Sequence, residues 1–204
     1  MSHRLLVVAT LLSLPVLSAC GEVDLYTLGA DDGVPPISGS TTIDVPQDYQ
    51  CGDAISDPEG KYVVTSSGTA DHCTFNFHQD VLAIQASDYS DNPELEGAQA
   101  VSKININVSA FNVIDPATNE RPTGLLSLDG KAFDTTILTE ADLDTPPPFT
   151  VTIEGEPVDQ LKDQVQNKED IIIPVDVVVE VDMTPTPASI QLDFDAQPEI
   201  VLGF

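Results

Sequence analysis

Apolar and polar side chains alternate along several segments of this chain, and this period of two constrains the fold more than any other feature. Within residues 101–109, Ile104, Ile106 and Val108 alternate with polar residues. Successive side chains of a β-strand point to opposite faces of a sheet. The pattern therefore predicts a strand with one buried and one solvated face.

Shorter alternating segments extend this pattern over most of the chain after residue 50. We expect further strands at residues 61–65, 73–77, 81–85, 125–128, 133–138, 149–153, 175–182, 189–195 and 199–202. Turn-forming residues such as Asp129-Gly130 stand between them at intervals of about ten residues. Many short alternating strands predict an all-β fold, an antiparallel β-sandwich that is immunoglobulin-like in general architecture. The chain contains no Trp, whereas a true immunoglobulin domain has a characteristic buried Trp.

One short helix is expected near residues 157–167. Pro157 suits the first helical position, where its missing N–H group costs nothing. Val158, Leu161 and Val165 follow at helical spacing. We expect this helix to cap one open end of the sandwich.

The first nineteen residues have a different character. Arg4 is followed by an uncharged, mainly apolar run over residues 5–17. A permanent membrane span needs about 20 apolar residues, so this run is typical of a signal peptide instead.

The residues at the end of this run are Leu17-Ser18-Ala19-Cys20. They resemble the lipobox of bacterial lipoproteins, in which a branched apolar residue and two small residues precede a modified cysteine. The resemblance implies cleavage before Cys20 and a diacylglycerol thioether on its sulfur. It usually implies a third acyl chain, such as palmitate, on the new amino group. The alternative is an ordinary signal peptide that ends at a cysteine by chance.

A lipidated Cys20 would place the protein in the cell envelope, attached to a membrane without spanning it. Lipid burial contributes about 0.8 kcal/mol per methylene, and two chains anchor stably where one does not. Gly21 follows Cys20 and does not match the Asp that retains enterobacterial lipoproteins in the inner membrane. For a Gram-negative host, the outer membrane is therefore favoured.

Composition divides the chain into three parts. Residues 1–19 are the expected signal peptide. Residues 20–49 are rich in Gly, Ser, Thr, Asp and Pro, which predicts a lipidated cysteine followed by a flexible tether. Residues 42–45 are the exception, because they could join the domain as a first edge strand. Residues 50–204 form the expected β-sandwich domain.

The chain is strongly acidic, with a formal net charge of −27 at pH 7. All 34 acidic residues lie after residue 19. Such a surface repels nucleic acid and anionic headgroups, which excludes nucleic-acid partners and electrostatic docking to an anionic membrane. Solubility in a crowded or saline envelope is the simplest interpretation of the charge, and cation binding is the alternative.

Cys51 and Cys73 remain once Cys20 is assigned to lipid. Export places them in an oxidising compartment, where disulfides persist, so we expect them to pair. Two separate buried thiols are the alternative. No CxxC motif is present, which argues against a thiol-exchange role.

His72 and His78 fall on the same face of one expected strand. Six residues at about 3.3 Å each would separate them by about 20 Å, too far for both to bind one metal ion. The pair is therefore interpreted as part of a solvated face.

Residues 88–96 contain four carboxylates between two expected strands. Calcium binds six to eight oxygen ligands, often from such loops, and Asp88, Asp91 and Glu94 are the candidate ligands. The EF-hand spacing is missing, and Pro93 stands where its glycine would be. A solvated loop without a cofactor is the competing and simpler interpretation.

None of the nucleophile elbow, HExxH, P-loop or dinucleotide motifs occurs in the chain. The sequence therefore favours a non-enzymatic, membrane-anchored envelope lipoprotein with no cofactor. Its β-sandwich would bind another envelope protein or a glycan, or have a structural role. One alternative is a calcium-dependent adhesion or surface-layer module, and a second is a carboxylate-based hydrolase.

Overall fold

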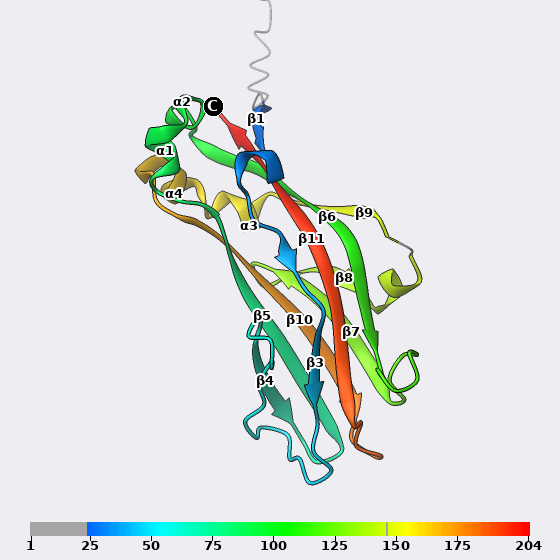
Figure 1. The fold of residues 1–204 in the computed structure, drawn as a ribbon. Coiled ribbons are helices and arrows are strands. Elements are labelled where there is room, and N and C mark those ends of the chain that lie inside the picture. The colour runs from blue at the N-terminus through cyan, green and yellow to red at the C-terminus, as the bar shows by residue number, and fades with distance from the viewer. Residues whose placement is uncertain (1–23, 146) are drawn as a thin grey trace, which may run out of the picture.

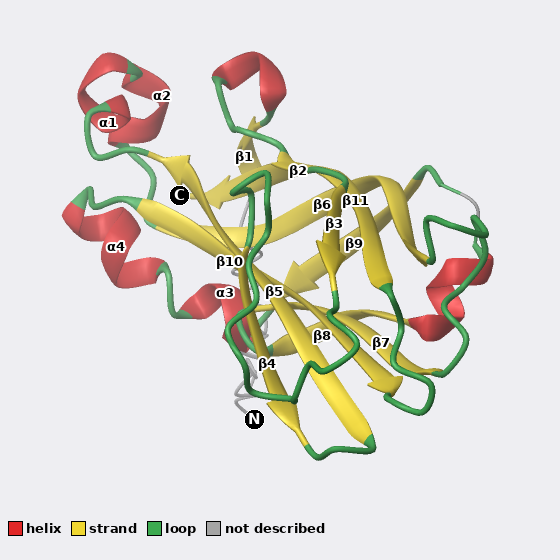
Figure 2. Ribbon diagram, turned by 60° about the horizontal axis from the view of Figure 1, so that its bottom comes forward, coloured by secondary structure: helices red, strands yellow, loops and turns green. Residues whose placement is uncertain are grey.

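Two antiparallel sheets packed face to face form the body of the molecule (Figures 1 and 2). This computed structural model describes residues 24–145 and 147–204, without the side chains of Asp24, Leu25, Ser38 and Glu94. The expected signal peptide, lipobox and Cys20 lie outside the described residues. Among the described residues, no helix is long and apolar enough to cross a membrane.

The first sheet, called here the β11 sheet, has the order β1-β11-β6-β9, and β2 and β3 also pair with β11. Its strands are β1 (Asp24–Leu28), β2 (Ile37–Ser38), β3 (Thr41–Asp44), β6 (Ala100–Ile114), β9 (Phe149–Glu154) and β11 (Ser189–Gly203). The second, called the β10 sheet, has the order β4-β5-β10-β7-β8. Its strands are β4 (Val63–Gly68), β5 (His72–Ile84), β7 (Leu125–Ala132), β8 (Thr135–Thr139) and β10 (Ile171–Asp182). The predicted all-β sandwich is thereby confirmed.

Short helices connect the strands. They are η1 (Ala30–Asp32), α1 (Asp88–Asp91), α2 (Pro93–Glu96), η2 (Glu140–Asp144), α3 (Glu156–Asp159) and α4 (Lys162–Asn167). The single helix expected near residues 157–167 is in fact two, α3 and α4, with Gln160 and Leu161 between them. Both contact β6, and the three apolar side chains predicted to face inward are buried.

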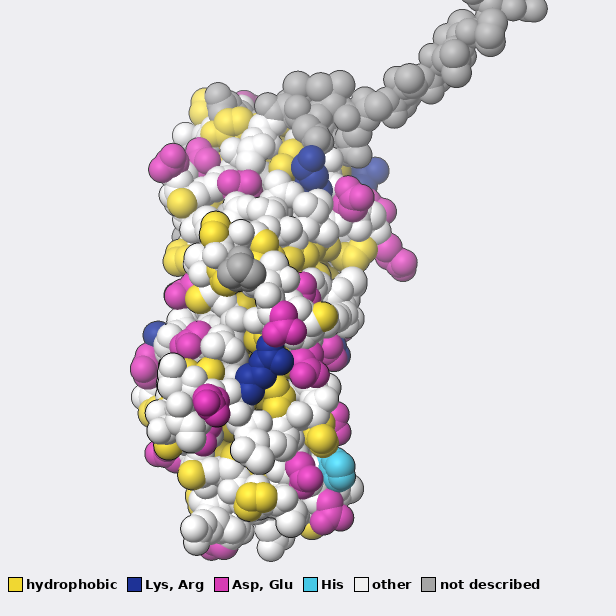
Figure 3. Space-filling view, turned by 90° about the vertical axis from the view of Figure 1, so that its right-hand side faces the viewer, with side chains coloured by type: hydrophobic (Ala, Val, Ile, Leu, Met, Phe, Trp, Pro, Cys, Tyr) yellow, Lys and Arg dark blue, Asp and Glu magenta, His cyan; other side chains and the backbone are white. Residues whose placement is uncertain are grey.

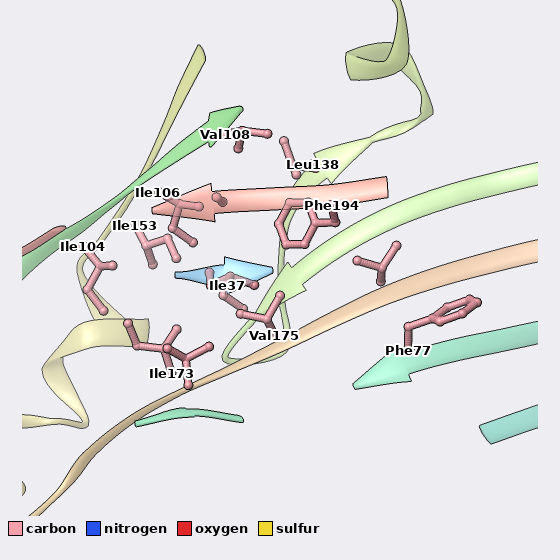
Figure 4. Packing of buried hydrophobic residues seen from close by; sticks show 14 of the residues in the cluster. Ile37, Phe77, Ile104, Ile106, Val108, Leu138, Ile153, Ile173, Val175 and Phe194 are labelled. Carbon is pink, nitrogen blue, oxygen red and sulfur yellow. The ribbon is translucent and has the colours of Figure 1, made fainter. Parts of the chain in front are cut away.

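The alternating pattern places one row of apolar side chains from each strand between the sheets. In Figure 4, Ile106 and Phe194 of the β11 sheet lie on the opposite side of the core from Ile173 and Val175 of the β10 sheet. All four side chains are almost completely buried. Each such side chain contributes about 1.5–3 kcal/mol relative to an exposed one.

Two prolines lie within long strands, at points where a neighbouring strand is missing. Pro174 of β10 pairs with Asp80 of β5, but the pairing of β7 with β10 ends one residue away, at Val175. Pro198 of β11 lies between the stretches paired with β2 and with β1. Because proline has no N–H group, it is tolerated in a strand that has a free edge.

The prediction of a flexible tether at residues 20–49 is wrong for most of that range, because β1, β2 and β3 all pair with β11. The buried side chains of this segment are Leu28, Val34, Ile37, Thr41, Ile43 and Val45. Each short strand buries only one or two apolar residues, but pairing with β11 satisfies its backbone groups. The edge strand considered for residues 42–45 is present as β3. The domain therefore includes Asp24 and does not start at residue 50.

Two strand boundaries also differ from the predicted ones. Asp129-Gly130 is not a turn but part of β7, where a Cβ on Gly130 would approach the Leu138 side chain to 3.0 Å. The turn is Phe133-Asp134, both with positive φ, as a two-residue type I′ hairpin requires. The strands expected at 73–77 and 81–85 are one continuous strand, β5.

A buried carboxylate organises the loop between β3 and β4. Asp57 accepts a hydrogen bond from the Thr41 hydroxyl and further bonds from the amides of Glu59, Lys61 and Tyr62. Burial raises the pKa of the Asp57 carboxyl, but these hydrogen bonds outweigh it and hold the pKa below its usual value. Ionised Asp57 therefore stabilises the folded state.

We expect Asp57→Asn to lower the free energy of unfolding by about 1–3 kcal/mol at neutral pH, because a charged acceptor of four hydrogen bonds is lost. The folded pKa is lowered, so this contribution is complete above the unfolded Asp value of about 3.9 and disappears as the pH falls through the folded pKa. Urea denaturation of both proteins from acid to neutral pH should show the difference shrinking toward acid. Asp48 is an exposed residue in the same loop. The control variant Asp48→Asn should leave the stability unchanged.

The predicted pairing of Cys51 with Cys73 is present as a disulfide, with the Cα atoms 5.6 Å apart. Cys73 is fully buried on the inner side of β5, whereas Cys51 lies in the loop between β3 and β4. The bond therefore ties this loop to the β10 sheet.

Reduction should destabilise the protein by about 3 kcal/mol, the chain-entropy estimate for a loop of this length. The Cys51→Ala/Cys73→Ala variant should unfold near the denaturant concentration at which reduced wild type unfolds. Equal stability of the oxidised and reduced wild type would contradict a structural role for the bond.

Candidate functional site

A pocket of about 150 Å³ lies at the end of the sandwich where β1 starts. The end of β5, the segment from β1 to η1, and α1 with α2 contribute its lining residues, and these elements lie at the same end of the molecule (Figure 1). We call it the α1–α2 pocket; its lining residues are Leu28, Asp32, Val34, Ala83, Ile84, Asp88, Asp91, Asn92 and Leu95.

Local hydrogen bonds shape the helical side of this pocket. The Asp88 carboxylate accepts a bond from the Gln85 amide at 2.8 Å, and the Asn92 amide bonds to the Asp88 carbonyl at 2.9 Å. Pro93 then starts α2, a position where proline is favoured. Leu95 is buried against the core, so the short helices are fixed by packing as well as by these bonds.

The opposite wall comes from the segment that follows β1. The Asp32 carboxylate accepts bonds from the Tyr26 hydroxyl at 3.1 Å and from the Gly29 amide at 3.0 Å. These bonds hold η1 beside the pocket, while Leu28 and Val34 contribute apolar surface.

The pocket combines apolar and acidic lining residues. Three of its lining residues are aspartates, and none of its lining residues is basic. The same charge affects Tyr89 of α1, whose hydroxyl is buried and has no hydrogen-bond partner among the described residues. Burial, together with the charges of Asp88 and Asp170, raises the pKa of Tyr89 to about 12. The electrostatics of this end of the molecule therefore favour a cationic occupant.

Two of the three calcium ligands predicted from sequence, Asp88 and Asp91, line this pocket. The side chain of the third, Glu94, lies outside the described residues. Asp32 joins them from a segment that the sequence assigned to the tether. Within the described residues, no three His, Cys, Asp or Glu side chains are placed to hold a metal ion, so calcium binding stays a prediction from sequence.

Mutual repulsion of the pocket aspartates should be measurable. Asp91→Asn is expected to raise the melting temperature at low ionic strength, because it removes one of three like charges. The gain should fall as salt is added, since screening weakens interactions between exposed charges. A lower melting temperature for Asp91→Asn at all salt concentrations would show that Asp91 has an attractive partner.

A second polar cluster lies on the outer face of the β10 sheet. His78 contacts Asp176 through Nδ1 at 3.1 Å and Asp80 through Nε2 at 3.2 Å. The Asn76 amide also donates to Asp176, at 2.9 Å. No hydroxyl or thiol is hydrogen-bonded to His78 among the described contacts. The cluster therefore lacks the nucleophile of a hydrolytic triad.

The two histidines lie where the sequence placed them, six residues apart on the solvated face of one strand. His72 is exposed and His78 half-buried, while Cys73, Phe75 and Phe77 between them are buried. This arrangement supports the interpretation as a polar face.

Comparisons with protein-family models, with curated proteins and with solved structures found no match for this chain.

Sequence reasoning missed Asp32 as a member of the site. The signal was weak: Gly29 and Asp32 stand three residues apart between apolar residues, which suits a short helical turn. Without the pairing of β1 with β11, nothing in the sequence places this turn beside residues 88–95.

Proposed function

We propose that this chain is a non-enzymatic envelope lipoprotein, anchored through lipid on Cys20, whose β-sandwich binds another component of the envelope. The lipobox supports the anchor. The proposal locates the protein at a bacterial membrane, and at the outer membrane if the host is Gram-negative.

The observation that carries the proposal is the short distance along the chain between Cys20 and β1, the first described strand. Asp24, only four residues after Cys20, already belongs to β1 and pairs with Gly203. Four residues span at most about 14 Å. An anchored sandwich would therefore stand close to the bilayer, with the α1–α2 pocket at its near end.

The opposite end of the sandwich would point away from the membrane. The long loop between β3 and β4 and the connection between β10 and β11 lie at this end (Figure 1). Lipid anchoring would thus fix which surfaces are near the bilayer and which are presented outward.

The surface charge is consistent with anchoring by lipid alone. On the face shown in Figure 3, acidic side chains recur along the whole length of the molecule, whereas basic ones are few. Hydrophobic side chains on this face are scattered among polar ones. Because an acidic surface is repelled by anionic headgroups, the acyl chains must supply the membrane affinity.

Replacing the modified residue tests the anchor directly. Cys20→Ser should move the protein from the membrane pellet to the soluble fraction, because no acyl chain can attach through a thioether. Mass spectrometry of the wild type should find the mass of the acyl chains on residue 20. Asp48→Asn, which leaves the lipobox and the disulfide unchanged, is the control and should remain in the pellet. An unmodified sulfur in the wild type, or unchanged sedimentation of Cys20→Ser, would refute the proposal.

A further inference from the structure

One side of β5 has no neighbouring strand over about half of its length. β4 pairs with β5 only from Cys73 to His78. From Gln79 to Ile84, β5 pairs with β10 on one side, and no strand of the described structure pairs with it on the other. Alternate residues of this stretch direct N–H and C=O groups toward the open side. Such an edge is a template for one more strand.

Both faces of this edge offer contacts for the side chains of an added strand. On the outer face, Leu82 is 38% exposed and pairs across the sheet with Ile172, which is 44% exposed. On the inner side, Ala83 and Ile84 line the α1–α2 pocket. Alternate side chains of an incoming strand would therefore meet an apolar surface and a pocket, the combination by which strand addition becomes specific.

The charge of the pocket and of the β5 edge indicates what kind of partner would bind there. Asp32, Asp88 and Asp91 line the pocket without a basic residue among its lining residues, and exposed Asp80 lies on the edge itself. A second copy of this chain would bring the same aspartates and a net charge of −27, so like charges would oppose self-pairing. A positively charged segment fits both the edge and the pocket.

We propose that the open edge of β5, residues 79–84, binds an extended basic segment of a partner protein as an added strand, with a Lys or Arg side chain in the α1–α2 pocket. This deepens the proposed function and rests on its binding role, because it names the surface and the chemistry of the partner. Backbone hydrogen bonds to β5 supply affinity, and the three aspartates select for positive charge.

Selection of peptides by the intact protein tests this site. Random linear peptides displayed on phage are panned against the lipidated protein in nonionic detergent, and an enriched peptide is synthesised. The expected sequences alternate apolar residues with Lys or Arg. Binding of the synthetic peptide should slow amide hydrogen exchange in residues 79–84 and leave β9, at an edge of the other sheet, unchanged.

Matched variants distinguish binding at the β5 edge from nonspecific attraction to the protein's negative charge. Asp91→Lys should weaken the Kd of the peptide at least about tenfold, which corresponds to about 1.4 kcal/mol. Asp48→Lys makes the same charge change in the loop after β3 and should leave the Kd unchanged. Leu82→Ser, which removes apolar surface at an exposed position without changing the charge, is a second variant that should also weaken binding.

Three outcomes would overturn the proposal: no enriched peptide, enrichment of neutral or acidic peptides, or no exchange protection in residues 79–84. Equal weakening by Asp48→Lys and Asp91→Lys would overturn it too, because binding would then reflect overall charge. None of these results bears on acylation of Cys20, which mass spectrometry measures separately. Failure of this site and failure of the lipid anchor are therefore distinguishable.

Discussion

Antiparallel pairing along β11 is the interaction on which the rest of the structure depends. One side of this strand pairs with β6, and the other side pairs in turn with β3, β2 and β1. The three short strands have no other strand partner among the described residues. Without β11 they would be an extended polar segment, as their composition suggests. With it, their backbone groups are satisfied and their few apolar side chains close the core.

The same dependence explains which parts of the fold could be predicted from sequence. The long strands β6, β10 and β11 repeat an apolar residue at every second position, and this local pattern is sufficient to identify them. The two strands expected at 73–77 and 81–85 are one strand, β5, in which the polar Gln79 stands in the inward row between Phe77 and Val81. β1 and β2 carry too few apolar residues for any local signal. Their conformation is set by pairing with residues more than 150 positions away.

The candidate site likewise contains some residues that could be predicted from sequence and others that could not. Asp88 and Asp91 stand out in the sequence because they are close together in one acidic loop. Asp32 reaches them only through the pairing of β1 with β11, a contact that no local pattern encodes. The open edge of β5 could not be predicted either, because it depends on where β4 ends relative to β5. The tertiary arrangement therefore makes this acidic loop one wall of a pocket.

The position of β11 in the chain also constrains the order of folding. β1 pairs with residues 200–203 of β11. This pairing cannot form until those residues have been synthesised. Contacts between residues so far apart in sequence are slow to form, because a large loop must close first. The β11 sheet can therefore be completed only after β11 is available, whereas the β10 sheet, whose strands end at Asp182, contains no strand from beyond that residue.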